Sequence, residues 1–399
     1  MDSNKLSRMG RRRFIKTLTS IGISSAAITH LSQDGLAKIT DDPSDEIPRL
    51  LGLRHTNHDA LVEDGEIPER EPEFYTIPRD EWVRTETVHN AAQELANQLP
   101  QNPYISTVVR SDGEGLFISV EYQIVERVNA DENSPRDHNE STGDEIGLSY
   151  EDLQEQVPDR VSGSVGSGQH RETREGIRVE TQRIRIRESA TFNSKYRPVP
   201  GGCQVGWTFE DWYGTLATPA SYEYSNDPCW VTAAHVIKRE ERDVYQQDDL
   251  RSSPKIGESD QWTARGNGDI ATVLSNGTNL SWNIAGYNDS YDYQITGVLG
   301  RDKLCDMEQN DESLYIQGRT TGRNQGEVIG VDTRAPERIY LDFDTQGGDS
   351  GGPIFHVNSS GALIAGVFNN AIDRDRDGDF DESMGDIMAW AEEELNVIV

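Results

Sequence analysis

The stretch Gln346-Gly347-Gly348-Asp349-Ser350-Gly351-Gly352-Pro353, followed by the apolar pair Ile354-Phe355, is the most informative segment of this sequence. Glycine tolerates backbone angles closed to other residues, so such a loop lets several backbone N–H groups converge on one point. The N–H groups of Gly348 and Ser350 are candidate donors to a developing negative charge. A plain Gly/Ser turn between strands is common in β proteins. The extended G-D-S-G-G-P pattern instead favours Ser350 as a nucleophile.

A candidate base lies upstream, in Trp230-Val231-Thr232-Ala233-Ala234-His235. The pattern predicts an apolar strand with His235 at its end, where small neighbours leave room for a reactant. The ordinary pKa of histidine, about 6.5, suits proton transfer near neutral pH. An isolated histidine is more often structural, and we expect that of His356. The T-A-A-H context favours His235 as the base.

The candidate orienting acid is Asp269, in Asn267-Gly268-Asp269-Ile270-Ala271-Thr272-Val273. Asp269 opens an apolar run and is expected to be partly buried, where a carboxylate needs a hydrogen-bond partner such as an imidazole N–H. Four other acids between the base and the nucleophile lie in polar loops and are less suitable: Asp243, Asp248, Asp249 and Asp260.

The motifs T-A-A-H, G-D-I-A and G-D-S-G-G-P, in the order His, Asp, Ser, resemble the chymotrypsin/trypsin-like serine peptidases. The order differs from that of subtilisins and α/β-hydrolases. Gly318-Arg319-Thr320-Thr321-Gly322 with Gly326-Glu327-Val328 is similar to the strand-turn-strand before the nucleophile in streptogrisin-like members. The resemblance covers residues 198–390 and implies an all-β fold of two six-stranded antiparallel barrels with the triad between them. It also implies a secreted endopeptidase that acts on protein or peptide substrates and requires no cofactor.

The sequence departs from this family at its cysteines and at its activation signal. Val236 follows the histidine where many relatives have a bridged cysteine, whereas Cys203 and Cys229 are expected on neighbouring antiparallel strands. The resemblance therefore suggests a Cys203–Cys229 disulfide, compatible with the reach of such a bond. An Ile-Val-Gly-Gly motif, whose ammonium group pairs with the acid beside the nucleophile in animal members, is missing, so Asp349 needs another partner.

Substrate preference is suggested by one further acid. Asp344 lies six residues before Ser350, the offset at which trypsin-like members carry the acid that selects Arg or Lys. The alternative is one more surface carboxylate in an acidic protein.

An acid-rich run near the C-terminus has the spacing of a calcium-binding loop, with oxygen ligands at alternate positions and a turning glycine at Gly378. Met384 replaces the usual twelfth-position glutamate, and Glu382 or Asp386 would have to substitute. Acid runs are common in this chain, so a solvated run is the alternative to a structural calcium site. The candidate ligands are Asp373, Asp375, Asp377, Asp379 and Asp381.

The charge of the chain is extreme: 70 Asp+Glu against 38 Lys+Arg give a formal net charge of −32. Such a charge makes the compact state repel itself, and concentrated salt screens that repulsion. Scattered acidity with few lysines resembles haloarchaeal proteins and predicts adaptation to high salt, although an acidic mesophilic protein is an alternative. Nucleic acid is not expected as a partner, because its phosphates would be repelled.

Residues 1–37 have the pattern of an export signal. Arg11-Arg12-Arg13-Phe14-Ile15-Lys16 before a weakly apolar run resembles a twin-arginine signal, which implies the twin-arginine translocation machinery as a partner and an extracellular location. A basic amphipathic anchor helix is the alternative. The run is too short and too rich in Ser and Thr for a stable membrane span. No other apolar segment of the sequence approaches the length needed to span a membrane.

Between the signal and the catalytic motifs we expect a polar linker at 38–85 and a small α/β module at 86–190, either a pro-region or an accessory domain. The module would contain a helix at 81–99, strands at 104–110, 115–125 and 176–186, and a flexible acidic insert at 129–172. Short strands with turn signals then indicate an all-β domain at 196–399. It would end in a helix with one face formed by Met384, Ile387, Met388, Ala391 and Leu395.

Two other classes of function remain open beside peptidase. The catalytic scaffold could be silent and serve as a binding module, or the N-terminal region could be the functional part of a cell-surface protein. The complete set of His, Asp and Ser contexts favours catalysis.

Overall fold

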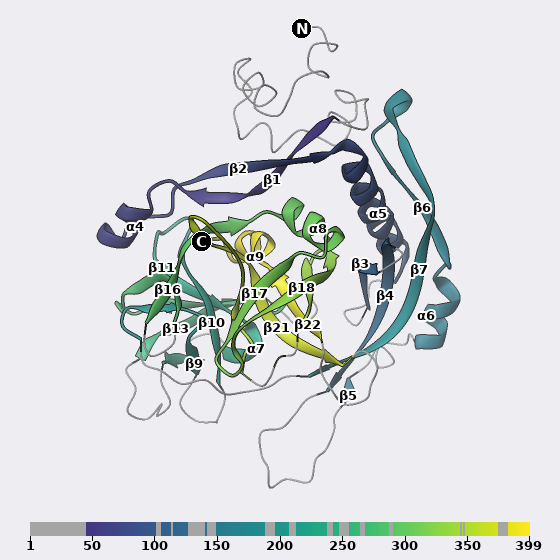
Figure 1. Ribbon diagram of the computed structural model, residues 1–399. Helices are drawn as coiled ribbons and strands as arrows, with labels where there is room; N and C mark the ends of the chain where they lie inside the picture. The colour runs from purple at the N-terminus through teal and green to yellow at the C-terminus, as the bar shows by residue number, and fades with distance from the viewer. Residues whose placement is uncertain are drawn as a thin grey trace.

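The computed structural model describes residues 45–100, 105–112, 115–126, 140–141, 149–187, 196–206, 213–237, 242–246, 255–263, 268–286, 290–343, 345, 348–373 and 382–399. Two closed antiparallel β-barrels form the centre of the molecule, and a mixed α/β region wraps around one side of them (Figure 1). The predicted fold class is confirmed. None of the described helices combines the length and apolarity needed to cross a bilayer.

The first barrel closes through a ring of six antiparallel strands. In spatial order they are β10 (Tyr213–Tyr222), β11 (Pro228–Thr232), β14 (Ala271–Ser275), β13 (Lys255–Trp262), β12 (Asp243–Tyr245) and β9 (Gln204–Gly206), and β9 pairs back onto β10. Apolar side chains from alternate positions fill the interior. The strands of this ring carry fully buried apolar residues on both faces, among them Trp230, Val231, Leu216, Ile256 and Val273.

The predicted Cys203–Cys229 disulfide is wrong, because both thiols are free and buried. Strand β10 lies between the two cysteines: Leu216 on β10 donates its N–H to the Cys203 carbonyl, and Ala220 on β10 is in register with Cys229. Two strand spacings are about 9.5 Å, beyond the Cα separation of about 7 Å that a disulfide tolerates. Sequence alone could not show that a third strand intervenes.

The second barrel is a similar ring. Its strands, in spatial order, are β17 (Ser313–Gly318), β18 (Gly322–Asp332), β19 (Arg338–Asp342), β22 (Glu382–Ile387), β21 (Gly361–Asp373) and β20 (Pro353–Asn358). The β17–β18 hairpin is the predicted strand-turn-strand. The expected C-terminal helix begins later than its apolar face suggested: α9 spans Met388–Leu395, whereas Met384 and Ile387 belong to β22, since they pair with Tyr340 and Gly366.

Further elements lie within the barrel region beside the two rings. They are β8 (Val199–Gly201), α7 (Ala234–Ile237), β15 (Leu280–Ala285), β16 (Tyr291–Leu299), α8 (Arg301–Gln309) and β23 (Val397–Ile398). Strand β16 runs parallel to β21, and β23 returns the C-terminus to β10 of the first barrel.

The N-terminal region contains more regular structure than the sequence indicated. Its elements are β1 (Glu46–His55), α4 (His58–Asp64), β2 (Arg70–Pro78), α5 (Arg79–Gln98), β3 (Ile105–Asp112), β4 (Gly115–Glu126), β5 (Glu140–Ser141), α6 (Tyr150–Gln156), β6 (Arg160–Val165), η3 (Gly168–His170) and β7 (Glu172–Arg187). The predicted helix and its three strands are confirmed.

Two N-terminal expectations are corrected by these elements. The described part of the expected linker forms the β1–β2 hairpin, and the described part of the expected flexible insert contains α6 and β6. The hairpin is stabilised by packing of Ile47 and Ile77 against Trp82. Its other partner, β16, lies more than 230 residues away in sequence, with Gly52 in register with Leu299. Local patterns do not show such pairings.

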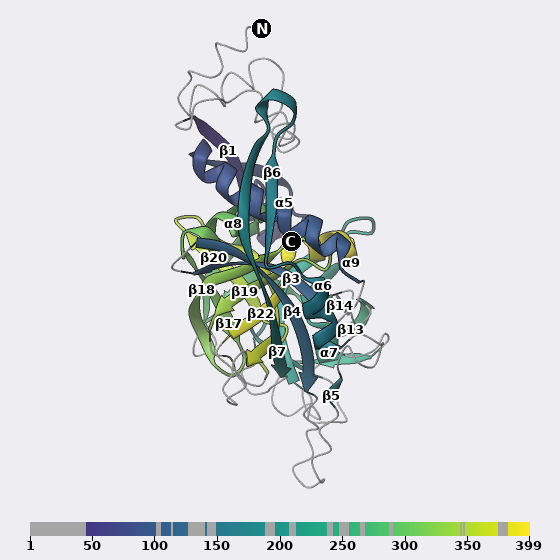
Figure 2. The ribbon, with the colours of Figure 1, turned by 90° about the vertical axis from the view of Figure 1, so that its right-hand side faces the viewer.

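The N-terminal region continues the sheet of the second barrel. Strand β1 pairs with β16, β3 with β18, and the end of β7 with the end of β21. In Figure 1 the β1–β2 hairpin crosses above the barrels while α5, β4, β7 and β6 stand beside them; Figure 2 shows this α/β layer in front of the barrels.

Buried charges lie where the N-terminal region meets the second barrel. We call this set, Arg49, Glu86, His89, Asp306 and Glu308, the charged seam. The Arg49 guanidinium contacts the Glu86 carboxylate and lies 3.2 Å from that of Asp306, and His89 Nε2 lies 3.2 Å from a Glu308 carboxylate oxygen. The seam joins β1 and α5 to α8.

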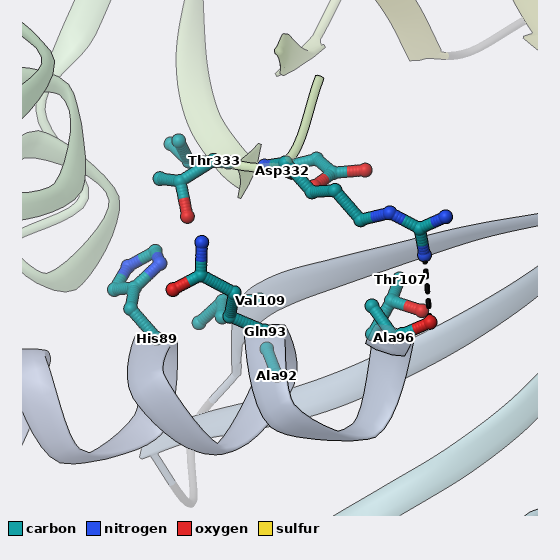
Figure 3. A pocket seen from close by; sticks show the side chains of 10 residues that line it. His89, Ala92, Gln93, Ala96, Thr107, Val109, Asp332 and Thr333 are labelled. Atoms are coloured by element: carbon teal, nitrogen blue, oxygen red, sulfur yellow. Dashed lines mark hydrogen bonds between the residues drawn. The ribbon is translucent and has the colours of Figure 1, made fainter. Parts of the chain in front are cut away.

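A small polar cavity adjoins the seam between α5 and β18 (Figure 3). Side chains of His89, Gln93, Thr107 and Asp332 line it, and its volume of about 10 Å³ is close to the minimum for one water molecule. Arg334 closes one end by donating from Nη1 to the Ala96 carbonyl at 2.8 Å.

Candidate active site

His235 and Asp269 are held together by three contacts. The pairing of β11 with β14, in which Thr232 faces Ala271, brings the two segments side by side. The Asp269 carboxylate accepts from the His235 backbone N–H at 2.9 Å through Oδ1 and hydrogen-bonds to the imidazole Nδ1 through Oδ2, while the Ala234 N–H donates to the Asp269 carbonyl at 3.1 Å. With Nδ1–H committed to the carboxylate, the basic lone pair of the neutral ring is on Nε2.

The local structure at these two residues differs slightly from the prediction. His235 lies in the short helix α7, three residues after the last residue of β11, rather than at the end of the strand. Its side chain is 15 % exposed and that of Asp269 is 25 % exposed. The pair is therefore packed firmly but still reachable from solvent.

The glycine loop around Ser350 is fixed by Thr215 of the first barrel. The Thr215 N–H donates to the Ser350 carbonyl at 2.8 Å, and its hydroxyl donates to the Gly348 carbonyl at 2.7 Å. Gly348 has φ of +102° and Gly351 has φ of +88°, angles that glycine adopts without strain. Thr215 therefore orients the loop through the carbonyl groups of Gly348 and Ser350. The backbone N–H groups of the same two residues have no hydrogen-bond partner among the described residues.

Asp349 hydrogen-bonds to Thr320 and Thr321, which take the place of the ammonium group of the missing Ile-Val-Gly-Gly motif. One carboxylate oxygen accepts from the N–H groups of Thr320 and Thr321 at 2.7 and 3.1 Å, and the other accepts from the Thr321 hydroxyl at 2.8 Å. A Cβ on Gly318 would collide with this carboxylate. The β17–β18 turn thus anchors the residue next to Ser350.

The Ser350 loop packs against the segment that carries His235. A Cβ on Gly214 would meet both the Val236 side chain and the Ser350 carbonyl, the latter at 2.8 Å. A Cβ on Gly351 would lie 3.1 Å from the Ala233 N atom. The segment that carries His235 and the loop that carries Ser350 therefore pack near each other, around Gly214 and Gly351.

Strand β21 passes directly beside Ser350. The Ser350 hydroxyl, which is almost buried, donates to the Asn369 carbonyl at 2.9 Å. Two residues further along the strand, Ala371 pairs with Arg187 at the end of β7. The N-terminal region thus occupies an edge of β21 close to Ser350.

Other candidate residues lie partly or wholly outside the described residues. Asp344 does, and so do four of the calcium candidates: Asp375, Asp377, Asp379 and Asp381. Asp373 is buried at the end of β21. Within the described ranges no three His, Cys, Asp or Glu side chains are grouped as metal ligands would be.

Three residues that support the site were not predicted in that role: Thr215, Asn369 and Asp386, which was considered only as a substitute calcium ligand and whose Oδ2 accepts from the Asp269 N–H at 2.6 Å. Thr215 and Asn369 act through contacts between segments distant in sequence, and no local signal could have identified them. Asp386 had one available signal, a carboxylate within the otherwise apolar run Met384-Gly385-Asp386-Ile387-Met388.

No protein-family model matches the chain, and no curated protein is significantly similar to it. Solved structures similar to it include a glutamic acid specific serine protease, with 17% identity, a TM-score of 0.40 and coverage of 50% of this chain and 100% of that one. Nocardiopsis protease has 17% identity, a TM-score of 0.38 and coverage of 50% and 97%. An alpha-lytic protease homolog has 17% identity, a TM-score of 0.39 and coverage of 51% and 99%.

Proposed function

We propose that this chain is a secreted serine endopeptidase that cleaves protein or peptide substrates through an acyl-enzyme. The observation that carries the proposal is the bond between the His235 imidazole and the Asp269 carboxylate, next to a glycine loop that presents Ser350. A carboxylate on Nδ1 leaves Nε2 as the proton acceptor and stabilises the imidazolium that forms. The G-D-S-G-G-P context of Ser350 supports the same chemistry.

In the proposed reaction the Ser350 oxygen attacks the substrate carbonyl carbon while its proton passes to Nε2 of His235. The resulting oxyanion accepts hydrogen bonds from the N–H groups of Gly348 and Ser350. His235 then gives the proton to the leaving amine as the C–N bond breaks, and an acyl ester remains on Ser350. Water attacks that ester by the same steps in reverse order and releases the acid. The Ser350 hydroxyl must first turn from the Asn369 carbonyl toward His235.

Covalent labelling tests this proposal. After the full chain has matured to its active form, a fluorophosphonate probe at high KCl concentration should label it at Ser350, as mapped by peptide mass spectrometry, and Ser350→Ala should abolish labelling. Ser360→Ala, in the exposed turn after β20, is the matched control and should be labelled normally. A folded wild-type protein that neither reacts with the probe nor cleaves peptides would contradict the proposal and favour a catalytically silent binding or cell-surface module.

The N-terminal region is proposed to keep the enzyme latent. The support is the pairing of Arg185–Arg187 with Ala371–Asp373, since an extended substrate that adds a strand to β21 would compete for the same edge. The active species should then be a shortened chain that begins between about residue 185 and residue 200, as mass spectrometry of the active fraction would reveal. Full peptidase activity of the intact chain would contradict latency.

Two finer features remain predictions. If Asp344 selects basic residues, peptides ending in Arg or Lys should be cleaved faster than those ending in Phe or Leu; the reverse preference would dismiss its role.

If the acidic run that starts at Asp373 binds calcium, millimolar Ca²⁺ should raise the unfolding temperature and Asp377→Asn should remove the increase, whereas equal unfolding temperatures with and without Ca²⁺ would exclude the site.

Salt adaptation and export complete the proposal. With a net charge of −32, self-repulsion should weaken as the screening length falls from about 10 Å at 0.1 M to about 3 Å at 1 M salt. The unfolding temperature is therefore expected to rise with KCl, and a flat response would contradict adaptation to salt. Residues 1–37 are outside the described residues; replacing the paired Arg11 and Arg12 with Lys should prevent export through the twin-arginine machinery.

A further inference from the structure

Asp386 is a fully buried carboxylate that the proposed reaction does not use directly. It lies near the end of β22, in the second barrel, and is inaccessible to solvent. Burying an ionised carboxylate is costly unless hydrogen bonds or opposite charges compensate. Burial raises the pKa of Asp386 to about 6, with Arg338 acting in the opposite direction. The contacts of Asp386 must therefore compensate the cost of burying its carboxylate.

The contacts of Asp386 come from both barrels. Its Oδ2 accepts from the backbone N–H of Asp269 at 2.6 Å, in the first barrel. From the second barrel, the Asn369 side chain hydrogen-bonds to the same carboxylate, and Arg338 on β19 places its Nε 3.8 Å from Oδ1. Asp269 is the other ionisable group that acts on it, by repulsion.

The packing around this contact allows little displacement. Gly268, with φ of +90°, passes between Asp386 and the Trp390 ring of α9, and a Cβ at this position would lie 3.2 Å from Asp386 Oδ2 and collide with the ring. The backbone of Asp269 is therefore seated on Asp386 by close packing as well as by a hydrogen bond.

Both residues held by Asp386 contact the proposed catalytic groups. Asp269 orients the His235 imidazole, and the Asn369 carbonyl accepts from the Ser350 hydroxyl. These two groups belong to different barrels. We infer that Asp386 is a positioning residue for the proposed peptidase reaction, a buried carboxylate that clamps the Asp269 loop of the first barrel to the Asn369 strand of the second. This inference rests on the proposed function.

The clamp has two separable effects. As a hydrogen-bond acceptor it fixes where the Asp269 backbone lies, and therefore how the carboxylate meets His235. As a negative charge it adds to the field of Asp269 and stabilises the imidazolium form of His235. Removing the charge while retaining an acceptor should therefore lower the pKa of His235, whereas a purely structural residue would not change it.

The test compares Asp386→Asn with wild type, each produced as the full chain and matured to its active form, by kcat, KM and the pH profile of kcat/KM on a peptide substrate. We expect kcat to fall roughly 10-fold to 100-fold, as misplacement of reacting groups produces, with KM changed less than about 2-fold. The acid limb of the profile should move to lower pH by roughly 0.5 unit. Asp332→Asn is the matched control, since Asp332 is another buried acid that acts on Arg338 and does not contact the catalytic groups; its kcat and acid limb should equal those of wild type.

The possible outcomes separate the inference from the proposed function. A folded Asp386→Asn variant with wild-type kcat and an unmoved acid limb would overturn the inference while leaving the peptidase intact. A wild-type protein without activity or probe labelling would overturn both. If Asp386→Asn does not fold, Asp386→Ser serves in its place: it removes the charge and is too short to reach the Asp269 N–H, so kcat should fall at least as far and the acid limb should move in the same direction.

Discussion

The interior of the first barrel and the charged seam are both buried, but they are held together by different forces. The barrel interior is apolar, with side chains such as Trp230 and Ile256 fully enclosed. At the seam, Arg49 is 4% exposed and Asp306 is 1% exposed, and each depends on the other for compensation of its charge. An apolar core loses stability in proportion to the atoms removed. Removing one partner of a buried ion pair costs about 3–5 kcal/mol, because the other charge is left buried and uncompensated. The two regions should therefore respond differently to substitution and to pH.

The largest effect is expected for a substitution that removes most of the catalytic activity and leaves the packing of both regions unchanged. Asp269→Asn retains the size of the side chain but disturbs the His235 tautomer, and kcat should fall about 10⁴-fold. Because neither the barrel core nor the charged seam is altered, the unfolding temperature should stay near that of wild type. Steady-state kinetics beside thermal unfolding would measure both, and a loss of activity that merely follows a loss of stability would contradict the catalytic role.

The next effect is on the charged seam. Arg49→Met leaves the carboxylates of Glu86 and Asp306 buried without their cation, so the free energy of unfolding should fall by about 3–5 kcal/mol. Arg54→Met is the matched control on the same strand, because Arg54 is 26% exposed and lies 3.4 Å from Glu73; it should cost less than about 1 kcal/mol. Equal losses in denaturant titrations would show that the seam does not depend on buried charge.

The pH response distinguishes the regions further. Burial raises the pKa of Asp332, beside the seam in Figure 3, to about 7. The folded state therefore binds this proton more tightly than the unfolded chain, so the contribution is fully present below about pH 4 and is lost as pH rises through 7. Asp332→Asn should remove this loss and raise stability at pH 8 by at most about 4 kcal/mol, while Arg338 retains Asp386 as its neighbour. Parallel stability curves for variant and wild type from pH 4 to 8 would refute this account.

The smallest effect belongs to the apolar core. Ile256→Val removes one methylene group from the first barrel and should cost about 0.5–1.5 kcal/mol. Because no charge is involved, the cost should be the same at pH 5 and pH 8. A cost that changes with pH would indicate that the core is coupled to ionisable groups.

The parts of the molecule that could be predicted from sequence are those that depend on residues close together in the chain. The contexts of His235 and Ser350, the short strands of the barrels and the α5 helix all depend on local patterns. The β1–β2 hairpin could not be predicted as such, because its stability comes from β16 and from the buried Arg49, which reads as a surface residue. The prediction of a Cys203–Cys229 disulfide was wrong for a related reason, since the position of β10 between the two cysteines depends on the tertiary structure. The support of Asp269 by Asp386 joins residues 117 positions apart and was equally hidden.

The central claim is that residues from both barrels act as one catalytic unit. The most direct test is a double-mutant comparison of peptide hydrolysis by His235→Ala, Ser350→Ala and the double variant. If the residues act together, each single variant removes nearly all catalysis, and the double variant should be no slower than the singles by more than about 3-fold. Losses that multiply in the double variant, or a His235→Ala variant that remains fully active, would contradict the claim.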